Sequence, residues 1–186
     1  MSSLASAGVA RLTLMQDPQG NGWQANVQQE LRSSLVCCSA AAFALEGLAH
    51  TCRAAPGNQS SGSGSKAVIG LVNGCFPIDP KDRPLRKHLD QSVKDLFKLR
   101  SHTVHHKAEF IESARTHPVL GQFGATSGDV AHLTVEASQR ACETLREIVI
   151  LIAFVRSRES EIPTGTARNS ARYVAECFGW TYPSAS

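Results

Sequence analysis

Apolar side chains recur at steps of three and four residues along most of this chain, the spacing that places them on one face of an α-helix. The longest such pattern runs from Trp23 to about Arg53 and is rich in alanine, which favours helix and lets helices approach closely. Together the patterns predict three long helices and two short ones, over residues 23–53, 67–72, 82–104, 134–158 and 166–178. Because no stretch shows a convincing strand alternation, we predict an all-α fold, an antiparallel helical bundle with long connections.

The connections are marked by turn-forming residues. Residues 58–65 (NQSSGSGS) predict a flexible linker loop. Residues 107–133 predict a long irregular loop, which is either a cover over a functional site or a surface loop without a functional role. Thr134 is expected to cap the start of a helix and Gly179 to cap the end of one. The chain is therefore predicted to consist of a flexible N-terminal arm with a short strand or an extra turn at 10–15 (1–22), a single helical-bundle domain (23–179) and a tail (180–186).

Composition places the chain among globular proteins with a sizeable core. It has 186 residues, of which 42% are hydrophobic and 19% charged, and the 6% of aromatic residues argue against an RNA-stacking sheet. None of the six cysteines forms a CxxC pair, and four fall in apolar helical patterns, so they are expected to be small buried hydrophobes. The N-terminus is a poor signal peptide, and residues 148–155 are too few to span a bilayer. We therefore expect a cytoplasmic location and no membrane partner.

Positive charge is concentrated in the middle of the chain. Between Asp79 and His117 there are nine Lys or Arg and six Asp or Glu, so nine minus six equals the formal net charge of +3 for the whole chain. Five of the seven histidines lie in the same segment. Such a segment favours either attraction of phosphate or simply a solvated helix face.

One arginine in this segment lies on an apolar helical face. Steps of four lead from Leu96 to Arg100 and then to Val104. Burying a bare guanidinium is very costly, so Arg100 is expected either to pair with a carboxylate such as Asp95 or Glu109, or to line a cleft.

The run LFKLRSHTVHH, from Leu96 to His106, resembles the Arg-x4-6-His signature of the HEPN superfamily, all-α domains of prokaryotic toxins, defence nucleases and nucleotide-binding modules. The flanking helical pattern, over residues 23–158, is also similar. The resemblance implies a homodimer that cleaves RNA without metal or another cofactor, partnered by an antitoxin or a nucleotidyltransferase. Where many active members carry Asn, Asp or His after the arginine, this chain has Ser101.

The resemblance also implies roles for individual residues. An imidazole titrates near neutrality and suits proton transfer, and a guanidinium suits charge stabilisation at phosphate. In a straight helix, residues five apart lie about 140° apart around the axis, so Arg100 and His105 converge only if the helix loosens after Val104 or across a dimer interface. The expected catalytic residues are Arg100, His105 and His106, and the expected substrate-binding residues are Lys98, Ser101, His102 and Lys107.

Two other interpretations of the Leu96–His106 segment stay open. The first is a non-catalytic HEPN-like module that binds a nucleotide or a protein partner. The second is a metal site, since His102 and His106 have the i, i+4 spacing that places two imidazoles on one side of a helix. A third ligand would then come from the remaining nearby histidines, His88, His117 or His132.

Overall fold

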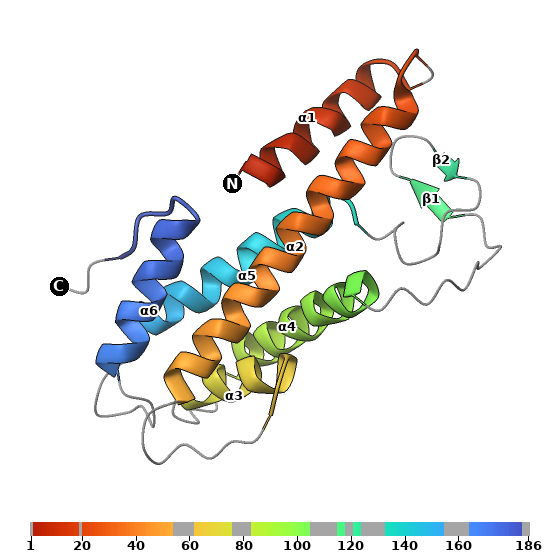
Figure 1. The fold of residues 1–186 in the computed structure, drawn as a ribbon. Coiled ribbons are helices and arrows are strands. Elements are labelled where there is room, and N and C mark those ends of the chain that lie inside the picture. Colours follow the sequence, from red (N-terminus) through yellow and green to blue (C-terminus); the bar gives the residue numbers. More distant parts are fainter. Residues whose placement is uncertain are drawn as a thin grey trace. The chain divides into compact units, whose positions relative to one another are not determined.

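The protein is described from a computed structural model, which covers residues 2–18, 20–53, 62–75, 83–104, 115–117, 121–123, 133–154 and 164–183. These residues form six helices and one small strand pair (Figure 1), so the predicted all-α class is confirmed for the described chain. The helices are α1 (Ser2–Gln16), α2 (Trp23–Arg53), α3 (Ser65–Cys75), α4 (Arg83–Val104), α5 (Val135–Phe154) and α6 (Thr164–Cys177). The strands are β1 (Arg115–His117) and β2 (Gly121–Phe123).

The five helices predicted from periodicity correspond to α2 through α6. Thr134 caps α5 as expected, because its Oγ1 accepts a hydrogen bond from the Ala137 N–H at 3.3 Å. Gly179 ends α6 with φ at +70°, where its N–H donates to the Glu176 carbonyl and the Trp180 N–H donates to the Ala175 carbonyl. That hydrogen-bond pair is a Schellman motif, which explains why a glycine stands there.

The sequence prediction for the N-terminus is wrong. Residues 2–16 are the helix α1, not a flexible arm, and residues 10–15 continue that helix without a strand. The buried side of α1 consists of Ala7, Ala10, Arg11 and Leu14, spaced as one helical face. Its charged member and the surrounding serines and alanines weaken the apolar signal, so the helical period is faint in the sequence.

The segment 107–133 contains the only described strands, which the periodicity did not predict. In the antiparallel pair, Arg115 faces Phe123 and His117 faces Gly121. The other residues up to 132 lie outside the described part of the chain, as do 58–61 of the predicted linker. At the end of that linker the Gly64 N–H donates to Glu46 Oε1 at 2.9 Å, so a specific hydrogen bond precedes α3.

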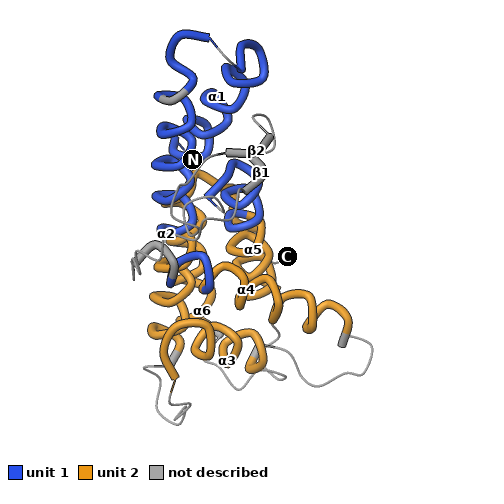
Figure 2. The backbone as a smooth tube through the Cα atoms, turned by 90° about the vertical axis from the view of Figure 1, so that its right-hand side faces the viewer, with its two compact units in different colours: residues 1–40, 98–142 blue, residues 41–97, 143–186 orange. Residues whose placement is uncertain are grey.

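The chain divides into two compact units (Figure 2), and α2, α4 and α5 each contribute to both. Unit 1 consists of residues 1–40 and 98–142, and unit 2 of residues 41–97 and 143–186. In unit 1, α1 runs beside the first half of α2 (Figure 1). The core of unit 2 includes fully buried aliphatic side chains from three helices, namely Leu45, Leu89, Val93, Ile148 and Ile152.

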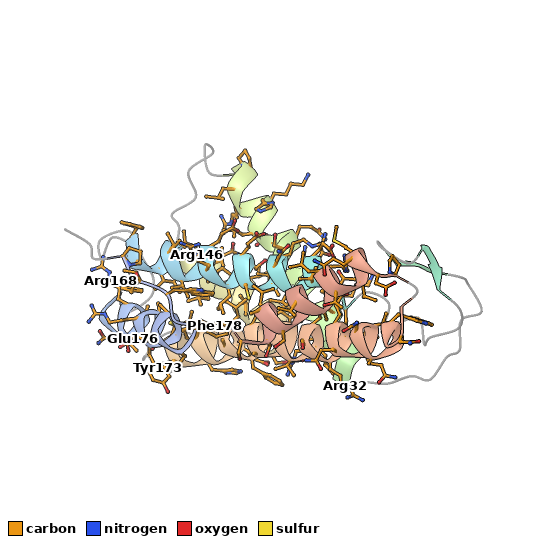
Figure 3. All side chains as sticks on the ribbon, turned by 90° about the horizontal axis from the view of Figure 1, so that it is seen from above. Arg32, Arg146, Arg168, Tyr173, Glu176 and Phe178 are labelled. Carbon is orange, nitrogen blue, oxygen red and sulfur yellow. The ribbon has the colours of Figure 1, made fainter. Side chains whose placement is uncertain are left out.

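The C-terminal helix, α6, shows how one face is buried. Along α6, Ala167, Ala171 and Ala175 are buried at helical spacing, while Tyr173 and Glu176 point outward (Figure 3). Tyr173 is 68% exposed.

The helix α2 is long and apolar enough over Ala25–Cys52 to cross a membrane, judged by length and composition alone. This is weak evidence, because the core helix of a globular protein passes the same test. Part of its length, including Glu30 and Leu45, is buried against the rest of the protein.

Candidate functional site

The helix α4 carries the residues that the sequence singled out. Its buried side includes Leu89, Val93, Leu96 and Phe97, as the helical period predicted, although Leu85 at the start of that stripe is 49% exposed. The described buried positions of α4 therefore run from Leu89 to Phe97, the stretch that leads into the motif.

Of the seven residues predicted for the site, three have described side chains. Lys98 and Ser101 are exposed, and they lie on one side of α4 because they are three residues apart. Arg100 is half-buried, four residues after Leu96 and three after Phe97, so it lies towards the apolar side of the helix. The structure thus separates two exposed polar groups from a cation that is partly withdrawn from water.

The histidine half of the motif lies beyond what the structure describes. His102 belongs to α4 by its backbone, and α4 ends at Val104. His105, His106 and Lys107 fall outside the described residues, as does Glu109. Of the carboxylates considered as partners for Arg100, Asp95 is exposed and accepts a hydrogen bond from Gln91 at 2.9 Å.

The described residues do not support the interpretation of the histidines as a metal site. Among the side chains that the structure places, no three of His, Cys, Asp and Glu are grouped so as to hold a metal ion. Of the histidines in that reading, only His88 has a described side chain, which is 64% exposed and lies 3.9 Å from Glu147.

A second charged cluster, which the sequence analysis missed, is buried in unit 1. Arg11 of α1 donates from Nε to Glu30 Oε2 at 3.0 Å and from Nη1 to Glu136 Oε1 at 2.6 Å. Its Nη2 also donates to both carboxylates. The Arg11 and Glu30 side chains are only 8% and 2% exposed, whereas Glu136 is 47% exposed. We call these three residues the Arg11 cluster.

The Arg11 cluster is joined to the start of α5. Glu30 Oε1 accepts a hydrogen bond from the Val135 N–H at 3.0 Å, so a carboxylate of α2 satisfies a backbone donor in the first turn of α5. A carboxylate at a helix N-terminus is also favoured by the helix dipole. The cluster therefore holds α1, α2 and α5 together through one guanidinium and one helix end.

The pKa shifts agree with strong pairing in this cluster. Burial disfavours the Arg11 cation, but the hydrogen bonds and charges of Glu30 and Glu136 outweigh it and raise the pKa of Arg11 above its usual value. For Glu136, partial burial acts upward, yet hydrogen bonds from its own backbone N–H, Thr134 and Arg11 lower its pKa. Both groups are thus held in their charged forms.

A sequence signal for the Arg11 cluster did exist. Arg11 is four residues after Ala7 and three before Leu14, and Glu30 is three after Val27 and eight before Cys38. Each is a charged residue on an apolar helical face, the same criterion that singled out Arg100.

Buried thiols form a third feature, and three of them, Cys37, Cys38 and Cys142, lie in unit 1. The predicted burial of four cysteines is confirmed for Cys37, Cys38, Cys52 and Cys142. Cys37 and Cys142 lie with their sulfurs 3.3 Å apart, and the Cys37 thiol is 3.8 Å from the Ser138 carbonyl oxygen.

The two charged features differ in their chemistry. The Arg11 cluster is saturated with partners and suits a structural brace, while the end of α4 presents exposed polar groups beside a half-buried cation.

Comparison of the chain with protein-family models, with curated proteins and with solved structures finds no match.

Proposed function

We propose that this protein is a HEPN-like, metal-independent endoribonuclease of toxin or defence type, with its site at the C-terminal end of α4. The observation that carries the proposal is the half-buried Arg100 on the apolar side of α4, directly before the histidines of the motif. Exposed Lys98 and Ser101 on the adjoining side give a phosphate a cationic and a hydrogen-bonding contact.

The chemistry follows from what RNA supplies. The ribose 2′-hydroxyl attacks the neighbouring phosphorus, the bond to the 5′-oxygen breaks, and the products are a 2′,3′-cyclic phosphate and a 5′-hydroxyl end. His105 or His106 takes the proton of the 2′-hydroxyl, and a second imidazole protonates the leaving oxygen. Arg100 stabilises the charge on the phosphorane, a contribution of about 10²–10³ in rate for a well-placed donor.

The proposal includes a homodimer. Two α4 ends brought together across a two-fold axis would place Arg100 of one subunit near a histidine of the other, which removes the angular problem within one straight helix. RNA is the proposed substrate, in the cytoplasm, and an antitoxin or a nucleotidyltransferase is the proposed regulatory partner.

The test is cleavage of a single-stranded RNA in the presence of a chelator. We expect cyclic-phosphate products from the wild type and a loss of at least about 100-fold in Arg100→Ala. His105→Ala and His106→Ala would show which imidazole acts. Lys94→Ala removes an exposed cation six residues before Arg100 on α4; it is the matched control and should cleave like the wild type.

The second candidate function is a non-catalytic module that binds a nucleotide at the same place. The observation that favours it is Ser101, exposed at the position where many active family members carry Asn, Asp or His. Nucleotide affinity that depends on Arg100, with no RNA cleavage by the wild type, would select this module and reject the nuclease.

A further inference from the structure

We propose that Cys37 and Cys142 form a reversible dithiol–disulfide pair, an oxidation site that ties α2 to α5 within unit 1. The two residues are 105 positions apart in the chain, yet their sulfurs lie 3.3 Å apart. A disulfide requires about 2.05 Å, so the sulfurs need to approach by only about 1 Å.

The surroundings favour Cys37 as the thiol that reacts first. A hydrogen bond from Cys142 lowers the pKa of Cys37, and a second contact joins Cys37 to Ser138. Its neighbour Cys38 differs, because burial raises the pKa of that thiol to about 11. Thiolate is the reactive form, so the adjacent cysteines in the same helix are expected to differ in reactivity.

The solvent exposure of the buried thiols also favours Cys37 and Cys142. Of the four buried cysteines that the structure describes, Cys37 and Cys142 keep 5% and 8% exposure, whereas Cys38 and Cys52 keep 0% and 1%. Because both thiols are buried, large oxidants cannot reach the two sulfurs. The proposed oxidant is therefore a small one, hydrogen peroxide.

The reaction balances with one peroxide for each disulfide. The Cys37 thiolate attacks one peroxide oxygen, the O–O bond breaks, and sulfenic acid and hydroxide form. The Cys142 sulfur then attacks the Cys37 sulfur, the S–O bond breaks, and the sulfenic oxygen leaves as water. Two thiols and one peroxide thereby give one disulfide and two waters, and a small dithiol reverses the bond by exchange.

The location gives this bond a structural consequence. Ser138, which contacts Cys37, follows Thr134 and Glu136 at the start of α5, and Glu136 belongs to the Arg11 cluster. A covalent link here fastens the first turns of α5 to α2 even when that cluster is opened.

The experiment uses the full-length reduced protein and a few equivalents of hydrogen peroxide. After the remaining thiols are blocked, trypsin releases residues 33–53, which contain Cys37, Cys38 and Cys52, and residues 141–146, which contain Cys142. Mass spectrometry should find these peptides linked, and dithiothreitol should separate them. The double variant Cys38→Ala/Cys52→Ala should keep the link, because Cys37 is then the only thiol in the first peptide.

Three outcomes would overturn the proposal. They are a link that persists in Cys37→Ala, the absence of a link in Cys38→Ala/Cys52→Ala, and oxidation of the exposed Cys177 alone in the wild type. Melting temperature gives an independent measurement: the oxidised protein should melt about 5 °C or more higher, since the bond closes a long loop. A fall in melting temperature would mean that the bond forms only by distorting the fold, and would also reject the proposal.

Discussion

Arg11 and Arg100 both occupy apolar faces of helices, yet the structure gives them different surroundings. The Arg11 side chain is 8% exposed and forms hydrogen bonds with two carboxylates, one of which also caps α5. Arg100 is half-buried, near the end of α4 and beside exposed polar residues. A charged residue at a core position is therefore an exception to the burial rules, but its position alone does not say whether it stabilises the fold or serves a functional site.

The two environments predict opposite consequences of removing the charge. A saturated buried cluster contributes to stability only as a unit, because loss of one partner leaves the other charge buried and unpaired. If the end of α4 is the RNA-cleaving site that we propose, its cation contributes mainly to the transition state. Mutations can therefore separate the two arginines by what is lost.

The largest effect is expected for Arg11→Met. This substitution leaves the Glu30 carboxylate buried without its cation, and the free energy of unfolding should fall by about 3–5 kcal/mol. Urea denaturation followed by circular dichroism measures this loss.

Two variants control that measurement. Arg32→Met, at an exposed position of α2 (Figure 3), should change stability by less than about 0.5 kcal/mol. The double variant Arg11→Met/Glu30→Gln should recover most of the loss, because it removes the buried charge and keeps an acceptor for the Val135 N–H. A similar loss in Arg32→Met would show that the cluster is not special.

The next effect concerns Arg100→Ala. We expect RNA cleavage to fall by at least about 100-fold, while the free energy of unfolding changes by about 1 kcal/mol or less. Parallel measurement of cleavage and urea unfolding on one preparation tests this split. A loss of several kcal/mol in stability would place Arg100 in the same structural class as Arg11.

A smaller effect is expected for Lys98→Ala, which removes an exposed charge from α4. If Lys98 contacts one phosphate of a single-stranded RNA, the slope of log affinity against log salt should decrease by about 0.7. Fluorescence anisotropy at several salt concentrations measures the slope. An unchanged slope would remove Lys98 from the binding surface.

The smallest effect is a pH dependence that comes from Glu136. Its pKa lies below the usual value of 4.5 in the folded protein, so its stabilising contribution is complete above that value and is lost as pH falls through the folded pKa. Because the side chain is 47% exposed, solvent screening keeps the contribution under about 1 kcal/mol.

Unfolding by urea between pH 3 and pH 7 measures this contribution. Glu136→Gln should lose less stability than the wild type across the acid range, and the two proteins should differ most near neutral pH. Parallel curves for the two proteins would contradict a role for this carboxylate.

Much of the helical layout was predictable because it depends on local patterns. The α2 boundaries at Trp23 and Arg53, the Thr134 cap and the Gly179 cap all follow from periodicity and from hydrogen bonds between near neighbours in the chain. The strands β1 and β2 were not predictable in this way, because three residues in each are too few for a period to show.

The all-α class, the approximate ends of α2 to α6 and the position of Arg100 on an apolar face could be predicted from the sequence, since these depend on spacing along one helix. The meeting of Arg11, Glu30 and Glu136, and the contact of Cys37 with Cys142, are seen in the folded structure alone. The physical reason is that these pairs are separated by 19 to 125 residues, and the favourable energy of a charge or thiol pair exists only once folding has brought its members together.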